Sequence, residues 1–214
     1  MEKNTQPKNT ALKDPDNWSN PILLITDAES SPQFKNGVVA YQKGDYPAAL
    51  REFELAAEKG NASALTNSAF TYHHGYGVPQ NYETAQKRYI FADKQGLATA
   101  QYNLGLMCRN GQGVDQDYVA ASKCFKFAAK QGLAEAQYNL GVMYFEGRGV
   151  SKDYQAAHMW LNIAAMGGDR VPVEMRDVVA NKMTVAQVKK AQTKAEDCIE
   201  KIIRAIEGAN SLMT

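Results

Sequence analysis

The sequence has almost no net charge and no long apolar run, and each absence excludes a class of protein. Its 24 basic and 23 acidic side chains leave a formal net charge of +1. Binding to nucleic acid needs clustered positive charge, and no run of Lys and Arg occurs. No stretch is long and apolar enough to form a membrane-spanning helix. We therefore expect no nucleic-acid partner and no membrane insertion.

Cysteine is also scarce. The three residues are Cys108, Cys124 and Cys198. An odd and sparse set does not fit a disulfide framework, so we expect reduced, buried thiols. Cys108 and Cys124 fall on two helices that should pair in antiparallel fashion. That pairing places Cys108 opposite about Val119, too far from Cys124 for a disulfide.

The N-terminus lacks the apolar core of a signal peptide. Residues 1–30 are mostly polar and are predicted to be a disordered arm, with the short apolar stretch 21–25 packed on the first helix. The expected location from this sequence is the cytoplasm. A signal peptide removed earlier would place the protein in the periplasm or outside the cell.

The chain contains an internal repeat. A shift of 36 residues aligns three blocks without a gap, namely 61–96, 97–132 and 133–168. Glycines follow an apolar-periodic run in each block, where a helix C-terminus favours a left-handed residue. An Asn or Asp then precedes the next run, as expected for an N-cap. These recurring residues are Gly75, Gly111 and Gly147, then Gly77, Gly113 and Gly149, then Asn81, Asp117 and Asp153, and finally Gly96, Gly132 and Gly168.

Small residues at helical spacing predict that the two helices of each block pack closely. They are Ala64, Ala100 and Ala136, then Ala69, Gly105 and Gly141, then Ala85, Ala121 and Ala157. A single helix hairpin cannot bury its apolar face, whereas stacked hairpins bury a continuous core. We therefore predict an all-α protein, an α/α superhelical solenoid of stacked antiparallel helix hairpins.

Two flanking units complete the prediction. Residues 31–60 form a shorter first repeat that has a tight turn at "KGDY" and is closed by Gly60. Residues 169–214 form a C-terminal helical cap. Pro172 suits the first turn of a helix that ends near Lys182, and "TVAQ" at 184–187 has the spacing of a capping box. A long helix then extends to about Glu207.

The long last helix has two interpretations. Its apolar stripe comprises Val188, Ala191, Ala195, Cys198, Ile202 and Ile206. This stripe can cover the fourth repeat. Because the helix is longer than a repeat helix, its end can also pair with a second copy, which makes a homodimer through Val185 to Ile206 the alternative.

These repeats resemble the Sel-one-like repeat (SLR) family, a relative of the tetratricopeptide repeat with longer loops. The resemblance rests on "AQYNLGLMCRNGQGVDQDYVAASKCFKFAAKQG" and its neighbours, and it covers about Phe34 to Ala195. The segment "GDYPAALREF" resembles the tetratricopeptide-like opening repeat of bacterial members. The second repeat departs from the pattern, with Ser68 where its siblings have Leu104 and Leu140. Ala128 and Ala129 stand near the places where some secreted members carry a cysteine pair.

The resemblance implies a solenoid that binds proteins in a concave groove lined by the first helix of each repeat. Aromatic and Arg side chains are frequent at such binding sites. The implied groove residues are Phe34, Tyr41, Asn67, Phe70, His73, His74, Tyr102, Asn103, Leu106, Arg109, Asn110, Tyr138, Asn139, Val142, Phe145 and Glu146. For Tyr102, Tyr138, Leu106 and the Asn row, packing between repeats is an equal alternative. We expect His73, Arg109 and Phe145 to be exposed.

The stretch "YHHGYGV" at 72–78 suggests a metal site or a phosphate loop, and neither is expected. His73 and His74 are adjacent on a helix and should point about 100° apart, with no Cys, Asp or Glu at ligand spacing. The glycines lack the Lys-Ser/Thr of a phosphate loop. We expect no metal, no cofactor and no catalytic residue. His158 is expected to be a packing histidine with satisfied hydrogen bonds.

The function predicted from these features is a non-enzymatic scaffold that binds a protein or peptide. The resemblance also allows an immunity or inhibitor protein that neutralises a bacterial toxin or effector. A metal-binding or enzymatic role is the weakest of the three, because no nucleophile, base and orienting group occur together in the sequence.

Overall fold

The computed structural model describes residues 31–211, and the side chains of all of these except residues 206 and 209–211. The polar arm 1–30 and the stretch 21–25 therefore lie outside the described residues. Within 31–211 every regular element is helical. The helices are α1 (Pro32–Gln42), α2 (Tyr46–Glu58), α3 (Ala62–His74), α4 (Tyr82–Asp93), α5 (Ala98–Asn110), α6 (Tyr118–Lys130), α7 (Ala134–Glu146), α8 (Tyr154–Ala164), the 3₁₀ turn η2 (Ala165–Gly167), α9 (Arg170–Ala180) and α10 (Val185–Ser211).

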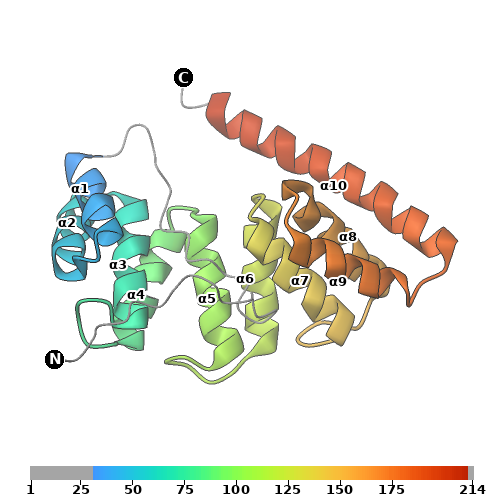
Figure 1. Cartoon of the computed structure of the whole chain (residues 1–214), viewed down its shortest axis with the longest axis horizontal. Coiled ribbons are helices and arrows are strands. Elements are labelled where there is room, and N and C mark those ends of the chain that lie inside the picture. The colour runs from blue at the N-terminus through green and yellow to red at the C-terminus, as the bar shows by residue number, and fades with distance from the viewer. Residues whose placement is uncertain (1–30, 212–214) are drawn as a thin grey trace, which may run out of the picture.

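The helices form a row of hairpins, as the sequence predicts (Figure 1). The helix pairs α1–α2, α3–α4, α5–α6 and α7–α8 make the closest contacts, and each hairpin packs on the next through α2–α3, α4–α5 and α6–α7. A solenoid of stacked helix hairpins is therefore the fold. α9 continues the row by packing on α8, and α10 lies across the end of it.

The helix boundaries follow from the capping residues. The side chains of Asn81, Asp117 and Asp153 accept hydrogen bonds from backbone N–H groups of the first turn, which confirms these predicted N-caps. At the other end of the first helices, Gly75 and Gly147 are left-handed, with φ of 72° and 76°. The loops between them hold seven residues, as in 75–81, whereas α1 and α2 are separated only by 43–45.

A second glycine in each loop joins one repeat to the one before it. A Cβ atom on Gly113 would lie 2.6 Å from Cβ of Tyr82, the first residue of α4. On Gly77 it would lie 2.7 Å from the backbone nitrogen of Pro47 at the start of α2. Gly149 meets the backbone of Tyr118 in the same way. Each loop therefore rests on the N-terminus of the preceding second helix, and only glycine fits there.

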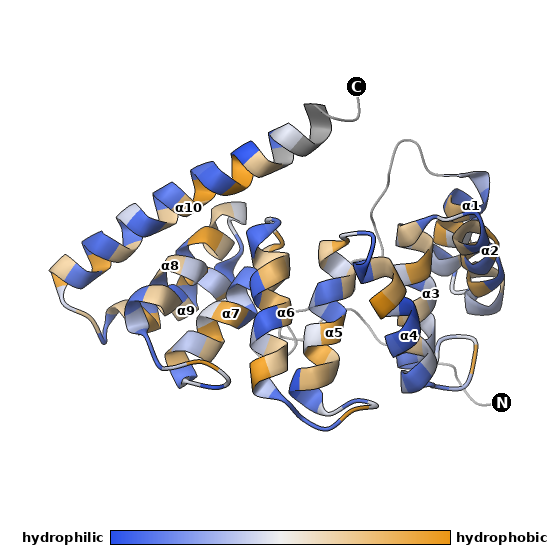
Figure 2. Ribbon diagram, turned by 180° about the vertical axis from the view of Figure 1, so that it is seen from behind, coloured by the Kyte–Doolittle hydropathy of each residue, from blue (hydrophilic) through white to orange (hydrophobic). Residues whose placement is uncertain are grey.

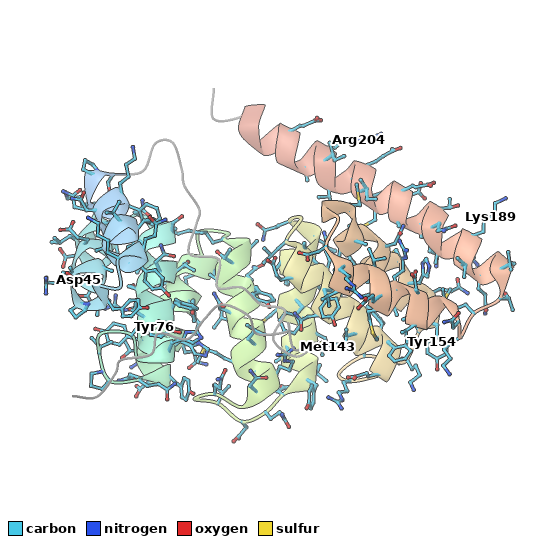
Figure 3. The ribbon with its side chains drawn as sticks, viewed as in Figure 1. Asp45, Tyr76, Met143, Tyr154, Lys189 and Arg204 are labelled. Carbon is cyan, nitrogen blue, oxygen red and sulfur yellow. The ribbon has the colours of Figure 1, made fainter. Side chains whose placement is uncertain are left out.

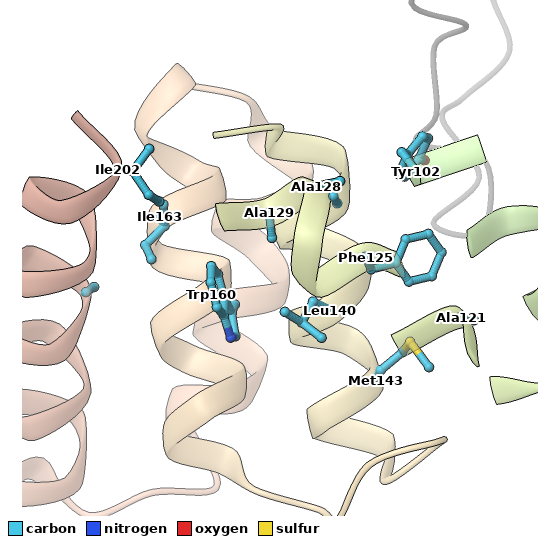
Figure 4. Packing of buried hydrophobic residues seen from close by; sticks show 12 residues of the cluster. Tyr102, Ala121, Phe125, Ala128, Ala129, Leu140, Met143, Trp160, Ile163 and Ile202 are labelled. Atoms are coloured by element: carbon cyan, nitrogen blue, oxygen red, sulfur yellow. The ribbon is translucent and has the colours of Figure 1, made fainter. Parts of the chain in front are cut away.

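Small residues bring the paired helices together, and one large residue per repeat fills the space between them. A Cβ atom on Gly105 would lie 2.7 Å from Cε1 of Phe125, and one on Gly141 would lie 2.7 Å from Cγ of Leu161. Tyr89, Phe125 and Leu161 occupy the same repeat position and are fully buried. Figure 4 shows Phe125 with Leu140, Met143 and Trp160 in the core of the third and fourth repeats.

The C-terminal helices cap the fourth repeat. The capping box predicted at 184–187 is present, since N–H of Thr184 donates to Oε1 of Gln187 at 2.8 Å and N–H of Gln187 donates to Oγ1 of Thr184 at 3.3 Å. α10 packs on α8, and it buries Ala191, Ala195 and Ile202. Figure 2 shows apolar and polar residues alternating along α10. The predicted cap is therefore confirmed, and the homodimer through Val185 to Ile206 stays a prediction.

Candidate interaction surfaces

The structure buries many of the side chains predicted for the groove. Buried ones are Phe34, Asn67, Phe70, His73, Tyr102, Tyr138 and Asn139. Half-buried ones are Tyr41, Asn103, Leu106, Arg109, Val142 and Phe145, and exposed ones are His74, Asn110 and Glu146. For Tyr102, Tyr138, Asn67 and Asn139 the burial agrees with the alternative interpretation, packing between repeats. The expected exposure of His73 was wrong.

His73 is buried because the next repeat covers it. Its Nε2 lies 3.2 Å from Oε1 of Gln112, in the loop of the third repeat, and its ring meets the edge of Tyr82 at 5.4 Å between centroids. Burial, with a smaller contribution from neighbouring His74, lowers the pKa of His73 to about 4. The imidazole is therefore neutral at pH 7, and its Nδ1 has no hydrogen-bonding partner among the described residues.

The two adjacent histidines do not point apart as expected. Their rings stack, with 4.6 Å between centroids and 18° between planes. His74 also stacks on Tyr76 at 5.4 Å, and its Nδ1 lies 3.1 Å from the carbonyl oxygen of Phe70. Burial lowers the pKa of His74 as well. The spacing of residues along a helix does not predict this stacking, because Tyr76 lies in the loop after α3 and packs back over His74, the last residue of the helix.

These rings belong to an aromatic cluster at the junction of the first and second repeats. Tyr46 and Tyr76 stack at 5.0 Å, and Tyr41 packs its ring on Tyr46 at 5.1 Å. Tyr76 lies 5.8 Å from Phe70, and Figure 3 labels its position beside the first repeat. Burial raises the pKa of Tyr41 well above its usual value. The cluster fastens the short first repeat to the second.

Polar groups fasten the third repeat to the fourth. Nη1 of Arg109 donates to Oδ1 of Asn139 at 2.6 Å, and Nδ2 of Asn139 donates to the hydroxyl oxygen of Tyr102 at 3.3 Å. Asn139 Nδ2 also donates to the carbonyl oxygen of Glu135 at 2.8 Å. Arg109, predicted to face a partner, thus has a structural contact between α5 and α7.

What remains accessible on the first helices is a short row. His74, Asn110 and Glu146 occupy the same repeat position at the ends of α3, α5 and α7, and all three are exposed. Half-buried Arg109 and Phe145 lie beside them, and Phe145 packs on Tyr154 at 5.7 Å. We call His74, Asn110 and Glu146 the first-helix row. The row offers an imidazole, an amide and a carboxylate.

An open hollow lies at the N-terminus of α8. Tyr154 is the first residue of its second helix, like Tyr82 and Tyr118, but the loop of a further repeat does not follow it. The residues that line this hollow include Tyr144, Lys152, Tyr154 and Gln187, and Figure 3 labels Tyr154.

The described residues form no cluster of metal-ligating side chains. Among residues 31–211, no three His, Cys, Asp or Glu side chains are placed to hold a metal ion. The three cysteines are free thiols, and burial raises the pKa of Cys124 to about 11 and that of Cys108 and Cys198 above the usual value. Such thiols are protonated at pH 7 and are weak nucleophiles.

His158 packs in the core as expected, but its Nδ1 has no hydrogen-bonding partner among the described residues. The prediction that the hydrogen bonds of His158 are satisfied was therefore wrong. Burial lowers its pKa. Within 31–211, no helix is both long enough and apolar enough to cross a membrane.

Comparison with known proteins agrees with the repeats seen here. The sequence model of the Sel1 repeat matches residues 35–61, 62–87, 98–133 and 134–169, which is more than half of the chain. The chain belongs to the Sel1 repeat family. The matches include the short first repeat, which resembles the tetratricopeptide opening unit.

Two solved structures share this fold. A Sel1 repeat protein from Oxalobacter formigenes is 30% identical, with a TM-score of 0.60 over 76% of this chain and 74% of that one. The second, c5321, is a protective antigen present in uropathogenic Escherichia coli strains and displays an SLR fold. It is 26% identical, with a TM-score of 0.51 over 85% of this chain and 48% of that one. No curated protein matches the chain.

Family membership sets the general class of function. Sel1 repeat proteins are generally protein-interaction scaffolds and are typically not catalytic. Both structural relatives are bacterial. The immunity role, the identity of a partner and the homodimer stay predictions.

Proposed function

We propose that this Sel1 repeat protein is a non-enzymatic scaffold that binds a segment of another protein along the first-helix row. The observation that carries the proposal is the exposure of His74, Asn110 and Glu146 at one repeat position, on helices whose neighbouring side chains are fixed. A rigid surface with a few accessible polar and aromatic groups loses little entropy on binding.

The fixed neighbours support this proposal. Arg109 donates a hydrogen bond to Asn139 and Phe145 packs on Tyr154, and both side chains stay half-buried, so part of each faces solvent beside the row. Leu106 and Val142 add half-buried apolar surface on the same helices. The row therefore combines apolar contact with hydrogen-bonding groups, which is the usual composition of a binding surface for a polypeptide segment.

The test is a co-purification of tagged full-length protein from cells of the source bacterium, followed by affinity measurement on the recovered partner. The variant His74→Ala/Asn110→Ala/Glu146→Ala removes the row. His74 stacks on His73 and Tyr76, so thermal melting first measures the stability lost by this variant, and binding is compared at a temperature where both proteins are folded. We expect the partner to bind at least about tenfold more weakly, since several interface contacts are lost together.

A matched control uses another exposed repeat position. Lys59→Ala/Gln95→Ala/Gln131→Ala removes three side chains at the ends of the second helices. This variant should bind the partner as the wild type does. Equal binding by the row variant and the wild type would contradict the proposed location. Failure to recover any specific partner would count against the scaffold function.

A further inference from the structure

The exposed side of the second helices carries an apolar ladder, which we define as Leu55, Phe91, Phe127 and Ile163. These residues occupy one repeat position, five residues before the glycine that closes each repeat. They lie on α2, α4, α6 and α8. The ladder is on the second helices and is therefore separate from the first-helix row.

Only one rung of the ladder is covered within the described chain. Ile163 is 6% exposed because α10 packs on α8 and places Ala195 and Ile202 in the same cluster. Phe91 and Phe127, at the equivalent position, are 56% and 62% exposed, and Leu55 is 46% exposed. In the fourth repeat α10 covers this position. In the other three repeats no described helix covers the equivalent side chain.

The covering helix shows what kind of surface fits the ladder. The face that α10 turns to α8 consists of Ala191, Ala195, Cys198 and Ile202, at spacings of four, three and four residues. Small and medium side chains at this spacing form one stripe of a helix. The stripe packs on Ile163, the fourth-repeat member of the ladder, as one helix packs on another.

Positive charge lies beside two of the uncovered residues, Phe91 and Phe127, with Asp93 the acidic residue near them on α4. Lys123, Lys126 and Lys130 flank Phe127 on α6, which contains no acidic residue, and all three are exposed. Lys94 follows Phe91 at the end of α4, next to Ile90, which is 41% exposed. None of these four lysines forms a salt bridge with another described residue. The second-helix surface of the first repeat differs, because Glu52, Glu54 and Glu58 lie on α2.

The end of α6, which follows Phe127, lies near α10. Cys198 of α10 is close enough to Lys130 for the ammonium charge to favour the thiolate, and Ile202 belongs to the same cluster as Ala129 of α6. α10 therefore packs on α8 and lies near the C-terminal end of α6. A second helix beside α10 would extend the covered surface from α8 across α6 to α4.

We propose that Phe91 and Phe127, with Lys94, Lys123, Lys126 and Lys130, form a docking site for an amphipathic helix of another protein. The apolar stripe of that helix covers the two phenylalanines, and acidic residues on its flanks pair with the lysines. This site is independent of the first-helix row, so the protein can hold two partners on opposite helices of its repeats. Aromatic anchors supply affinity, and the lysines supply orientation and salt dependence.

The experiment uses a synthetic peptide probe and the full-length protein. The probe is residues 185–207 of the chain with Lys189→Glu, Lys190→Glu, Lys194→Glu, Lys201→Glu and Cys198→Ala, which keeps the apolar stripe and makes its flanks acidic. A second peptide with only Cys198→Ala is the charge control. Fluorescence anisotropy measures binding at two salt concentrations. We expect the acidic probe to bind more tightly than the control peptide and to lose affinity as salt rises.

Three protein variants locate the bound probe. Phe91→Ser/Phe127→Ser should weaken binding by at least about tenfold, because both anchors are lost. Val39→Ser/Val178→Ser, which removes apolar side chains of similar exposure on α1 and α9, should bind like the wild type. Lys123→Gln/Lys130→Gln should bind more weakly and show a smaller salt effect. Thermal melting verifies that each variant is folded.

Several results would overturn the proposal. Equal binding of the probe to wild type and to Phe91→Ser/Phe127→Ser would place the probe elsewhere, for example on α8 in place of α10. Absence of binding to the wild type would exclude this ligand chemistry. A wild-type dimer in sedimentation that Phe91→Ser/Phe127→Ser abolishes would make a second copy the occupant. Tighter probe binding by Leu23→Ser/Leu24→Ser would make the N-terminal segment of the same chain the occupant.

Discussion

Arg88 of α4 reaches back to Glu54 of α2 and forms a salt bridge between the second and first repeats, with 2.7 Å from Nη2 to Oε1. The same guanidinium donates from Nη1 to Oγ of Ser68 at 2.8 Å and lies over the ring of Tyr72, 4.8 Å from its centroid. The Tyr72 hydroxyl donates to Glu54 at 3.2 Å. The side chains of Glu54, Ser68 and Tyr72 thus contact the guanidinium group of Arg88.

Loss of this cation should destabilise the N-terminal half of the solenoid. Arg88→Ala leaves the partly buried Glu54 without its charge partner and Ser68 without its donor. Removing one partner of a buried or half-buried pair costs more than the pair contributes. We expect a loss of about 1 to 3 kcal/mol in the free energy of unfolding, measured by urea denaturation at pH 7. An unchanged midpoint would contradict this role.

The repeat itself supplies a rescue for that variant. The positions of Ser68 and Arg88 hold Leu104 and Cys124 in the third repeat, so the equivalent pair is apolar there. Ser68→Leu/Arg88→Cys copies that pair into the second repeat. We expect the double variant to be more stable than the sum of the two single changes predicts, because the two residues touch. Strict additivity in a double-mutant cycle would show that the pair is not coupled.

This pair also shows what sequence can and cannot predict here. The repeat period, the caps at Asn81, Asp117 and Asp153, and the glycines at helix ends all reflect local backbone requirements, so the sequence predicted them. Ser68 was visible as a departure from Leu104 and Leu140. Its partner Arg88 was not, because the contact depends on how α4 packs against α3 and α2.

The candidate site was predicted less well than the fold for a related reason. The repeat pattern predicts on which face of its helix His73 lies. Its burial, however, depends on Gln112, in a loop of the next repeat. The exposure of Phe91 and Phe127 depends on where α10 ends. Position within a repeat sets the direction of a side chain, and only the neighbouring units determine whether it is covered.

The buried His73 should make the protein sensitive to acid. Its pKa is about 4 in the folded chain and 6.5 in its ordinary state, so the unfolded chain binds more protons between these values. Stability therefore falls as the pH decreases from about 7 towards 4, on the order of 2 kcal/mol at pH 5 from this residue. The fourth repeat has Phe145 at the position of His73. The variant His73→Phe should therefore be tolerated, and it should reduce this loss of stability by a similar amount.

Urea denaturation at pH 7 and pH 5 measures that effect as the difference between the two conditions for each protein. His74→Gln tests the neighbouring imidazole, whose pKa burial also lowers and whose charge contributes to the lowered pKa of His73, and it should reduce the loss at pH 5 by less than His73→Phe does. His158, whose pKa is also lowered, continues to contribute in both variants. If wild type and His73→Phe lose equal stability at pH 5, then His73 does not carry the acid sensitivity.

The cysteines should react slowly with alkylating reagents at neutral pH. The pKa of Cys124 is raised to about 11, and burial also raises that of Cys108 and Cys198. The thiolate is the reactive form, so its small population limits the rate. We expect iodoacetamide labelling of the native protein at pH 7 to be at least about tenfold slower than that of the urea-unfolded protein. Rapid labelling of one cysteine in the folded chain would identify a reactive thiol.

Alanine substitutions at Gly149 and Gly96 distinguish two losses of stability. One comes from a left-handed backbone, and the other comes from a clash between repeats. Both residues have positive φ, at 68° and 81°. A Cβ atom on Gly96 would meet nothing within 4 Å, whereas one on Gly149 would collide with the carbonyl oxygen of Tyr118 in the preceding repeat. Gly96→Ala should therefore cost about 1 kcal/mol, the usual penalty for a non-glycine residue in this conformation.

Gly149→Ala must also move one repeat away from the next, and we expect it to cost roughly 2 kcal/mol more than Gly96→Ala. Hydrogen exchange distinguishes the two variants further. Because repeat proteins are stabilised by contacts between neighbours, the Gly149→Ala variant should lose protection in α6, α7 and α8 together. Equal destabilisation by both variants would mean that this loop does not hold the third and fourth repeats in register.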